Sequence, residues 1–343
     1  MPTVRPDPSR ATIVNWPQLL EAAARHPFPE VWWLGQERNC LVIDASDGTL
    51  PGSPEQIASA GRWLRALPCP VVALVPACAG NAALAACDAR TARPEETALI
   101  ARNCGRSPLA ALALVHVLRA TENLAPACAL LVESLAYATL QTGPEFTKWR
   151  NEYVSSNSPA DEGPAVCIDR REDQLSIRLN RPRARNALNI AMRDALVEAF
   201  DLVSSDTSIA TATVSGIGRC YSVGGDLDEF GERPDAPSAH CIRSLRNPAL
   251  SLLRCAERVD FHLHGACIGS GIELPAFGRR IYARSDAYFQ LPELSLGLIP
   301  GSGGCVSLPR RIGRQRTALL ALTGRRLRAR DAVAWGLVDA LID

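Results

Sequence analysis

The 343-residue sequence lacks any uninterrupted apolar run of about 18 residues, the length that a membrane-spanning helix requires. Its first segment, "MPTVRPDPSRATIVNW", has three prolines and no apolar core, so it does not resemble a secretory signal. The formal net charge is only +1, which gives no indication of a nucleic-acid partner or of an anionic membrane surface. We therefore expect a cytoplasmic protein that binds neither membranes nor nucleic acids.

The sequence also lacks a spaced set of metal ligands. Its twelve cysteines, spread from Cys40 to Cys305, include no C-x-x-C pair and no regular spacing. In a cytoplasmic chain we expect reduced thiols that pack as small hydrophobic groups. His262 and His264 alternate along an expected strand, but no carboxylate or cysteine at ligand spacing accompanies them, so strand packing is favoured. We predict no metal site.

What the sequence does contain is a repeated alternation of strands, small-residue turns and helices. Two alternating strands are expected within residues 165–181, around a charged turn. Apolar residues at three- and four-residue steps predict a helix over residues 189–205, and a strand running into glycine follows at residues 209–218. This alternation predicts an α/β fold built from repeated strand–strand–helix turns.

Residues 151–165 are the most turn-rich stretch between two apolar regions, which predicts a linker. We therefore expect an N-terminal domain over residues 1–150 and a C-terminal domain over residues 166–343. The N-terminal domain repeats the alternation faintly, with a strand, a helix over residues 53–67 and another strand. It ends in an almost wholly helical segment, residues 107–150.

The N-terminal domain has a stretch that can be laid over a later one. The overlay pairs Gly80 with Gly269, Asn81 with Ser270, and Leu84 with Glu273. This pattern predicts a degenerate internal copy in which leucine replaces a carboxylate. Two unrelated α/β segments remain the alternative.

Two glycine-containing turns are candidates for binding an oxyanion. "SVGGD" (222–226) and "GSGIE" (269–273) each precede a predicted helix, and Pro275 is compatible with a first helical turn. The first N–H groups of a helix have no internal acceptor and favour negative charge. Two such turns could hold one carbonyl oxygen between two backbone donors, although glycine turns before helices are common.

Two glutamates have apolar neighbours in the sequence. Glu273 precedes "LPAF", and Glu293 lies between Pro292 and Leu294. Burial and like charge separate the pKa values of paired carboxyl groups, as acid/base catalysis requires. The structural alternative is that each glutamate caps a helix or pairs with one of three nearby arginines, Arg279, Arg280 and Arg284.

Residues from about 166 to the C-terminus resemble the crotonase (enoyl-CoA hydratase/isomerase) superfamily. Four motifs in order carry the resemblance: "LNRPRARNALN" (179–189), "CYSVGGDLDEF" (220–230), "HGACIGSGIELPAF" (264–277) and "YFQLPELSLGLIPGSGG" (288–304). The resemblance implies a repeated ββα superhelix, preceded here by the degenerate crotonase-like N-terminal half with its helical segment.

The resemblance also implies roles for individual residues. Val223 and Ser270 match the two positions whose backbone N–H groups form the oxyanion hole, and Glu273 and Glu293 match the catalytic glutamates of the hydratase subgroup. The expected substrate-binding residues are Gly224, Asp226, Gly269, Gly271, Arg183 and Arg185. For Asp226, capping of the next helix is favoured over action on the substrate, and for the two arginines a surface role has an equal claim.

The implied activity is reversible syn hydration of a 2-enoyl-CoA, with coenzyme A as part of the substrate and no other cofactor. Two alternatives are kept: another crotonase reaction (isomerisation or thioester hydrolysis), and a non-catalytic acyl-CoA-binding or assembly protein. The family implies a homo-oligomer, with a trimer as the expected form. Members typically continue beyond the "WGLVD" motif with helices that cover the site. We expect helices within residues 107–150 to replace them, donated to the same chain or to a neighbour.

Overall fold

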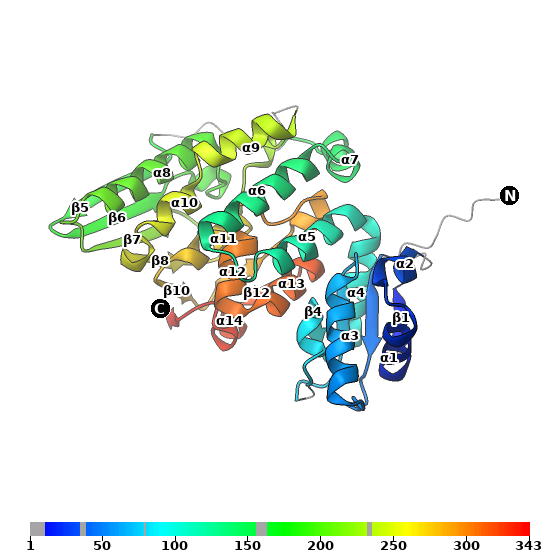
Figure 1. Ribbon diagram of the computed structural model, residues 1–343. Helices are drawn as coiled ribbons and strands as arrows, with labels where there is room; N and C mark the ends of the chain where they lie inside the picture. The colour runs from blue at the N-terminus through cyan, green and yellow to red at the C-terminus, as the bar shows by residue number, and fades with distance from the viewer. Residues whose placement is uncertain (1–10, 35–38, 79, 156–162, 232–234) are drawn as a thin grey trace. The chain divides into compact units, whose positions relative to one another are not determined.

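The computed structural model describes residues 11–34, 39–78, 80–155, 163–231 and 235–343. Contacts divide the chain into two compact units (Figure 1). Unit 1 comprises Met1–Ala120 and Arg314–Thr323, and unit 2 comprises Thr121–Gly313 and Gly324–Asp343. This division differs from the boundaries predicted at residues 151–165, of which 156–162 lie outside the described residues. A turn-rich composition marks a loop, but it does not reveal with which neighbour the preceding helices pack.

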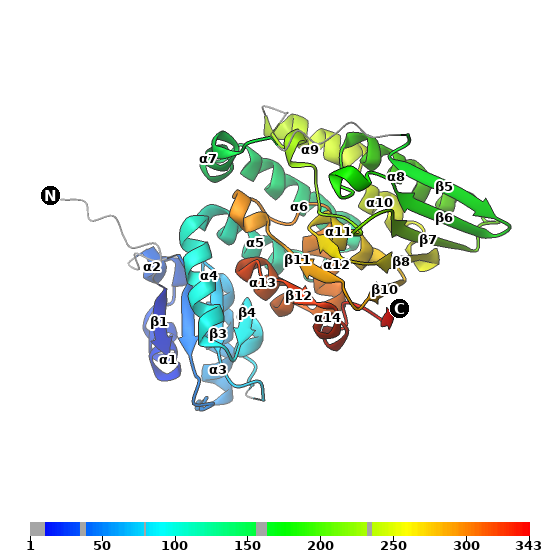
Figure 2. The same ribbon diagram turned by 180° about the vertical axis from the view of Figure 1, so that it is seen from behind.

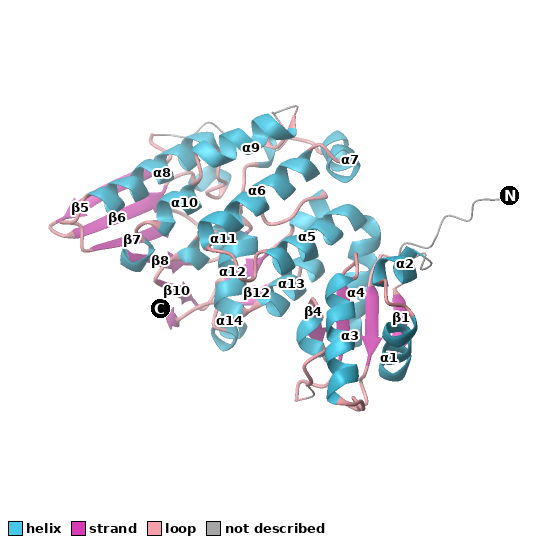
Figure 3. Ribbon diagram, viewed as in Figure 1, coloured by secondary structure: helices cyan, strands magenta, loops and turns pink. Residues whose placement is uncertain are grey.

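Unit 1 is built on a parallel four-stranded sheet in the order β1-β2-β3-β4, with its helices shown in Figure 3. The strands are β1 (Thr12–Asn15), β2 (Leu41–Asp44), β3 (Val71–Leu74) and β4 (Ala89–Thr91). The helical segments are α1 (Trp16–Arg25), α2 (Pro29–Leu34), α3 (Pro54–Ala66), η1 (Leu84–Ala86), α4 (Pro94–Arg106), α5 (Pro108–Ala120) and α13 (Arg314–Thr323).

Local sequence explains where the first helices of unit 1 begin. Asn15 and Ser53 each accept a hydrogen bond from the backbone N–H of the residue three positions later, and that residue's Gln side chain bonds back. Proline occupies one of the first two positions of both helices, where its missing N–H carries no penalty. The helix predicted over residues 53–67 is thereby confirmed.

The predicted degenerate copy corresponds to the stretch from β3 through η1 to β4. Leu84 is fully buried in the hydrophobic core of unit 1 together with Trp16, Ile43 and Leu64. Asn81 accepts a hydrogen bond from the Leu84 N–H, 3.1 Å. Leucine at position 84 therefore serves packing, and the internal repeat stays a prediction.

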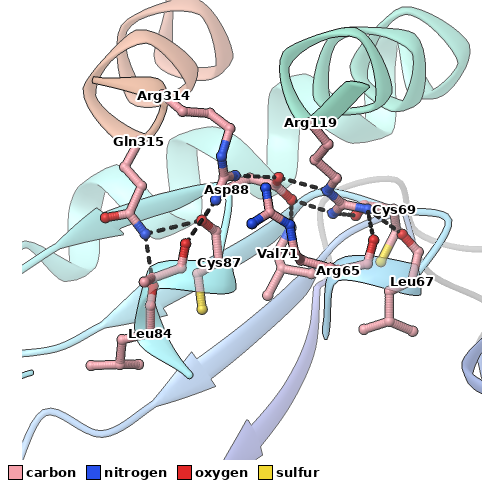
Figure 4. A network of polar contacts seen from close by, with 11 residues as sticks. Arg65, Leu67, Cys69, Val71, Leu84, Cys87, Asp88, Arg119, Arg314 and Gln315 are labelled. Carbon is pink, nitrogen blue, oxygen red and sulfur yellow. Dashed lines mark hydrogen bonds and ion pairs between the residues drawn. The ribbon is translucent and has the colours of Figure 1, made fainter. Parts of the chain in front are cut away.

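A buried ion-pair network attaches α13 to the rest of unit 1 (Figure 4). Asp88 is 1% exposed and pairs with both Arg119, 2.5 Å, and Arg314, 3.1 Å. The Val71 N–H also donates to Asp88, 2.9 Å. Gln315 donates to two backbone carbonyls of the η1 region. Because removing one member would leave buried charges unpaired, this network strongly couples α13 to the sheet.

Unit 2 divides its strands between two sheets. One has six strands in the order β13-β10-β8-β7-β6-β5, and the other has three in the order β12-β11-β9. Consecutive strands such as β8 and β9, or β10 and β11, belong to different sheets. The strands are β5 (Val166–Arg171), β6 (Gln174–Leu179), β7 (Thr211–Gly216), β8 (Val259–Leu263), β9 (Ala266–Ile268), β10 (Arg280–Arg284), β11 (Tyr288–Gln290), β12 (Leu327–Arg328) and β13 (Ala340–Ile342).

Helices that precede, separate and follow these strands in the sequence complete unit 2. The principal ones are α6 (Pro126–Gln141), α7 (Pro144–Glu152), α8 (Ile190–Ser205), α9 (Ala236–Leu245), α10 (Pro248–Leu253), α11 (Ser270–Glu273), α12 (Gly304–Ile312) and α14 (Ala329–Trp335). α8 packs on β5 and β6, as the view from behind shows (Figure 2). The α/β class, the β5–β6 strand pair and the helix over residues 189–205 are as predicted.

The helix α6 packs on α9, α10 and α12, and α7 packs on η6 (Glu293–Leu296). Helices within residues 107–150 were predicted to serve the same chain or a neighbour. Two of them, α6 and α7, pack within the same chain. Across the described ranges, no helix combines the length and apolarity needed to cross a membrane.

Candidate active site

A cavity of about 650 Å³ lies in unit 2. Its walls come from both turns singled out in the sequence, from α6 and from α9. Seven predicted site residues line it: Val223, Gly224, Asp226, Gly269, Ser270, Glu273 and Glu293. The fold thus gathers residues that are spread over seventy positions of sequence around one cavity.

The two turns meet through a short parallel pairing of backbone. The Ser222 N–H donates to Ala266, 3.1 Å, and the Ile268 N–H donates to Ser222, 3.0 Å. Gly224 has φ +97°, and a Cβ there would lie 3.0 Å from the Ile268 carbonyl oxygen. Gly269 has φ +52°. Both positive φ values favour glycine; a Cβ would crowd the facing backbone at position 224 and the Glu293 carboxyl at position 269.

The two predicted oxyanion donors differ in their local bonding. Ser270 is the first residue of α11, where an N–H group has no acceptor within the helix. The Val223 N–H donates to the Arg185 carbonyl oxygen, 3.2 Å. Arg185 presents that carbonyl from a left-handed backbone conformation, φ +54°. A substrate oxygen must therefore share the Val223 donor or displace the Arg185 carbonyl.

Glu273 ends α11 and is 2% exposed. Its Oε2 atom accepts two backbone N–H groups, from Ser302 at 2.7 Å and from Gly304 at 2.9 Å. Burial raises the pKa of this carboxyl to about 7, against the lowering effect of those bonds and of Arg243. Since Oε2 is occupied, Oε1 is the atom available to exchange a proton near neutral pH.

Glu293 begins η6 and is 8% exposed. Its Oε2 atom is buried and has no hydrogen-bond partner among the described residues. Burial, with the negative charge of Glu273 next, raises the pKa of Glu293 well above its usual range. Burial and the neighbouring charge therefore favour the protonated form of Glu293.

The Oε1 atoms of the two glutamates converge on the Gly269 turn. A Cβ built on Gly269 would lie 2.7 Å from Glu293 Oε1 and 3.7 Å from Glu273 Oε1. Both carboxyl groups therefore face the backbone that immediately precedes the Ser270 N–H. One acid and one base at a common point can add and remove protons on neighbouring atoms of one ligand.

The structural alternative is observed in part: Glu273 accepts backbone N–H groups at the start of α12, whereas pairing with Arg279 or Arg284 is not seen. Arg279 pairs with Asp260, 2.6 Å, and Arg284 pairs with Asp286, 3.5 Å.

Two side chains of this site were not predicted from the sequence. Glu133 of α6 is 1% exposed and bonds the same turn as Glu273. It lies in the apolar run "CALLVESLAYATL", which is the same kind of signal that singled out Glu273. Arg243 stacks on the Tyr137 ring, 4.3 Å from its centroid, and donates to the Gly301 carbonyl. No comparable signal in the sequence marked Arg243.

Some predicted site residues have other positions. Arg183 and Arg185 are exposed, and neither they nor Gly271 are among the described residues that line the cavity. A Cβ on Gly271 would lie 2.6 Å from the Ser222 carbonyl oxygen, so this glycine serves the close backbone approach. Asp226 caps η3 (Leu227–Glu229), as favoured, and pairs with Arg181, 2.9 Å.

The two histidines take part in local packing. His262 contacts the Tyr282 ring edge-on, and His264 bonds the Gly218 carbonyl, 3.0 Å. Within the described ranges, no three His, Cys, Asp or Glu side chains form a group suited to a metal ion.

The α/β fold and the two touching turns thus place a pair of buried glutamates beside backbone N–H groups. The model of one family, enoyl-CoA hydratase/isomerase, matches residues 170–343, about half of the chain. The chain belongs to the enoyl-CoA hydratase/isomerase family.

Relatives within the family carry out different reactions. The 2,3-dehydroadipyl-CoA hydratase of Escherichia coli (strain K12) is 33% identical over 174 residues, which cover 51% of this chain and 68% of the hydratase. The mitochondrial Delta(3,5)-Delta(2,4)-dienoyl-CoA isomerase of Mus musculus is 33% identical over 177 residues, which cover 48% of this chain and 54% of the isomerase.

Solved structures also match. An enoyl-CoA hydratase from Thermoplasma volcanium GSS1 is 34% identical with a TM-score of 0.49, over 53% of this chain and 73% of that one.

Proposed function

We propose that the protein is an enoyl-CoA hydratase that adds water reversibly and syn to a 2-enoyl-CoA thioester. The observation that carries the proposal is the convergence of Glu273 Oε1 and Glu293 Oε1 on the Gly269 turn. Family membership suggests the substrate class, because the hydratase and isomerase relatives are both named for acyl-CoA substrates. An isomerase that shuttles one proton needs only one such carboxyl group, whereas addition of water uses both.

In the proposed reaction, the N–H groups of Val223 and Ser270 hold the thioester oxygen as it gains enolate charge. Each donor of this kind is worth roughly 3–4 kcal/mol in transition-state stabilisation. The Val223 N–H must loosen its 3.2 Å bond to Arg185 for this purpose.

The two carboxyl groups divide the acid and base roles by their proton affinities. Glu273, with a pKa of about 7, takes a proton from water through Oε1 while the water oxygen bonds to C3. The C2=C3 π electrons move toward the thioester oxygen, and Glu293, whose pKa is raised by burial and by the charge of Glu273, gives its proton to C2 as the enolate collapses. The net addition is one H and one OH. The cycle closes when the proton on Glu273 returns to Glu293 directly or through solvent.

The test follows the loss of enoyl absorbance when purified protein is mixed with crotonyl-CoA and longer 2-enoyl-CoAs. We expect wild type to turn over, and Glu273→Gln and Glu293→Gln each to lose about 10²–10⁴-fold in kcat. Gly271→Ala is not a suitable control, because a Cβ at that position would meet the backbone of Ser222. Ser134→Ala is a suitable control, because Ser134 lies away from the two turns. Absence of turnover on every chain length, or full activity of Glu293→Gln, contradicts the assignment.

Mass analysis of the product separates the related reactions. Hydration adds one water, isomerisation leaves the mass unchanged, and thioester hydrolysis frees coenzyme A. Isomerisation is the second candidate because the mouse isomerase has the same 33% identity to this chain as the bacterial hydratase. Tight acyl-CoA binding with no product at all supports a binding protein instead.

A further inference from the structure

The turn before α12 is bonded by a second buried carboxylate besides Glu273. Glu133, on α6, accepts the Gly303 N–H through Oε1, 2.7 Å, and the Cys305 N–H through Oε2, 2.9 Å. Its side chain is 1% exposed, and its position in the chain lies before residues 170–343, which match the family model. Glu133 is thus a contribution of this chain's own N-terminal helices to the site.

The bonds of Glu133 and Glu273 alternate along residues 302–305. Glu273 takes the first and third N–H groups of this segment, and Glu133 takes the second and fourth. Successive N–H groups at the start of a helix have no internal acceptors, so each needs an external one. The two carboxylates together satisfy all four. Loss of Glu133 would leave two donors unpaired and free the segment that fixes Glu273 Oε2.

A carboxylate is an expensive way to cap a helix in a dry interior, since a hydroxyl or an amide would accept the same bonds. Glu133 also has charged and titratable neighbours on every element around it. They are Glu273 on α11, Glu293 on η6, Arg243 on α9, Tyr137 on α6 itself and Cys305 on α12. The charge of Glu133 therefore acts on the two glutamates that face the cavity.

We propose that Glu133 is a positioning residue: it holds the 302–305 segment, which binds Oε2 of Glu273 and thereby keeps Oε1 toward the Gly269 turn, and its charge helps to keep the proton on Glu293. This inference rests on the proposed hydratase function of Glu273 and Glu293. Glu133 itself touches neither substrate nor reacting atoms, so its effect is on kcat and on pH dependence.

The direction of the pH effect follows from the charges. Burial and the charge of Glu273 raise the pKa of Glu133 to about 8, so Glu133 becomes negative in the alkaline range. That charge opposes the loss of the proton from Glu293, whose pKa is raised by burial, by Glu273 and by Glu133. Removing Glu133 lowers the pKa of Glu293. The alkaline limb of kcat/KM, which reports loss of the acid, must then move to lower pH.

The first experiment compares Glu133→Gln with wild type across the pH range, using crotonyl-CoA hydration. We expect kcat to fall roughly tenfold or more through misplacement of Glu273, with a smaller change in KM. The alkaline limb should move to lower pH, because the loss of the Glu133 charge makes ionisation of Glu293 easier. Glu133→Asp keeps the negative charge but has a shorter side chain. Its alkaline limb should therefore stay close to that of wild type, while its kcat should remain low.

The matched control is Ser134→Ala, which removes a buried hydrogen bond of the same helix to His240, 2.9 Å, without touching residues 302–305. It should leave the pH profile unchanged. If Glu133→Gln is less stable but has the wild-type profile and kcat, Glu133 is only a structural cap and the proposal is overturned. The same holds if Ser134→Ala shifts the profile as much as Glu133→Gln does.

A second measurement needs no activity and begins with the wild-type protein. Infrared titration of the carboxylic acid C=O band in wild type should show buried carboxyl groups losing protons above pH 6. In Glu133→Gln or Glu133→Asp, one ionisation should be lost or moved, and that of Glu293 should shift. No titrating band in wild type overturns the proposal. If the infrared result is as expected but no enoyl-CoA is hydrated, the hydratase assignment alone fails.

Discussion

The raised proton affinity of Glu273 predicts an unusually high acid limit for activity. Burial brings its pKa from 4.5 to about 7. The folded site binds a proton more tightly than an ordinary glutamate does, so the base form is lost as the pH falls through 7. At pH 5.5 a glutamate with the usual pKa is about nine-tenths ionised, whereas one that titrates near 7 is only about 3% ionised. Below pH 6, kcat/KM should therefore fall about tenfold for each pH unit.

The assay is initial-rate hydration of crotonyl-CoA from pH 4.5 to 9, at substrate concentrations well below KM so that kcat/KM reports the free enzyme. Samples held at each pH and returned to pH 7.5 must recover full activity, which separates titration from acid unfolding. A reversible acid limb centred near pH 4.5 contradicts the reasoning, because Glu273 would then be solvated as an ordinary carboxylate. So does an acid limb that survives unchanged in Glu273→Gln.

Three further predictions concern single residues. Asp88→Asn removes the charged partner of two buried arginines, so it should lower the free energy of unfolding of unit 1 by about 3–5 kcal/mol in urea unfolding. The control Glu21→Gln breaks an exposed ion pair and should change that free energy by less than about 1 kcal/mol. Equal effects of the two substitutions would refute the role of burial. Arg243→Met removes a positive charge that lowers the pKa of Glu273, so the acid limb of kcat/KM should move to higher pH, and a move to lower pH contradicts this. Gly269→Ala puts a Cβ 2.7 Å from a site carboxyl in a left-handed backbone, so kcat should drop at least about tenfold while circular dichroism stays that of wild type.

Much of unit 2 could be predicted because its signals are local. The helix over residues 189–205 follows from apolar spacing and from Asn189, which caps it through the Met192 N–H. The pair Glu273 and Glu293 follows from apolar neighbours, which predict burial for a carboxylate wherever it lies in the fold. The capped helix at Ser53 in unit 1 is predictable for the same reason.

The donor bond of Val223 could not be predicted, because it depends on backbone conformation. Arg185 and Asn186 both have φ of +54°, which is unusual for residues with side chains. Asn186 is fully buried and bonds the carbonyls of Ile217 and Cys220, so these long-range contacts hold the turn. No spacing rule contains that information. The sequence could indicate which N–H groups are candidates, but not which acceptor they have before a substrate arrives.

Glu133 shows a different limit, since its local signal was as strong as that of Glu273. An apolar run around a glutamate predicts a buried carboxylate, but it does not predict what will satisfy it. The groups that satisfy Glu133 come from the start of α12, which packs against α6 although it lies over 160 positions later in the chain. They are two of the four N–H groups of residues 302–305, namely those of Gly303 and Cys305. The contact between Glu133 and the start of α12 was not predicted, because the linker predicted at residues 151–165 placed α6 in the N-terminal domain. A buried charge without a local partner is therefore best treated as evidence of a long-range contact, and here that contact leads directly to the proposed base.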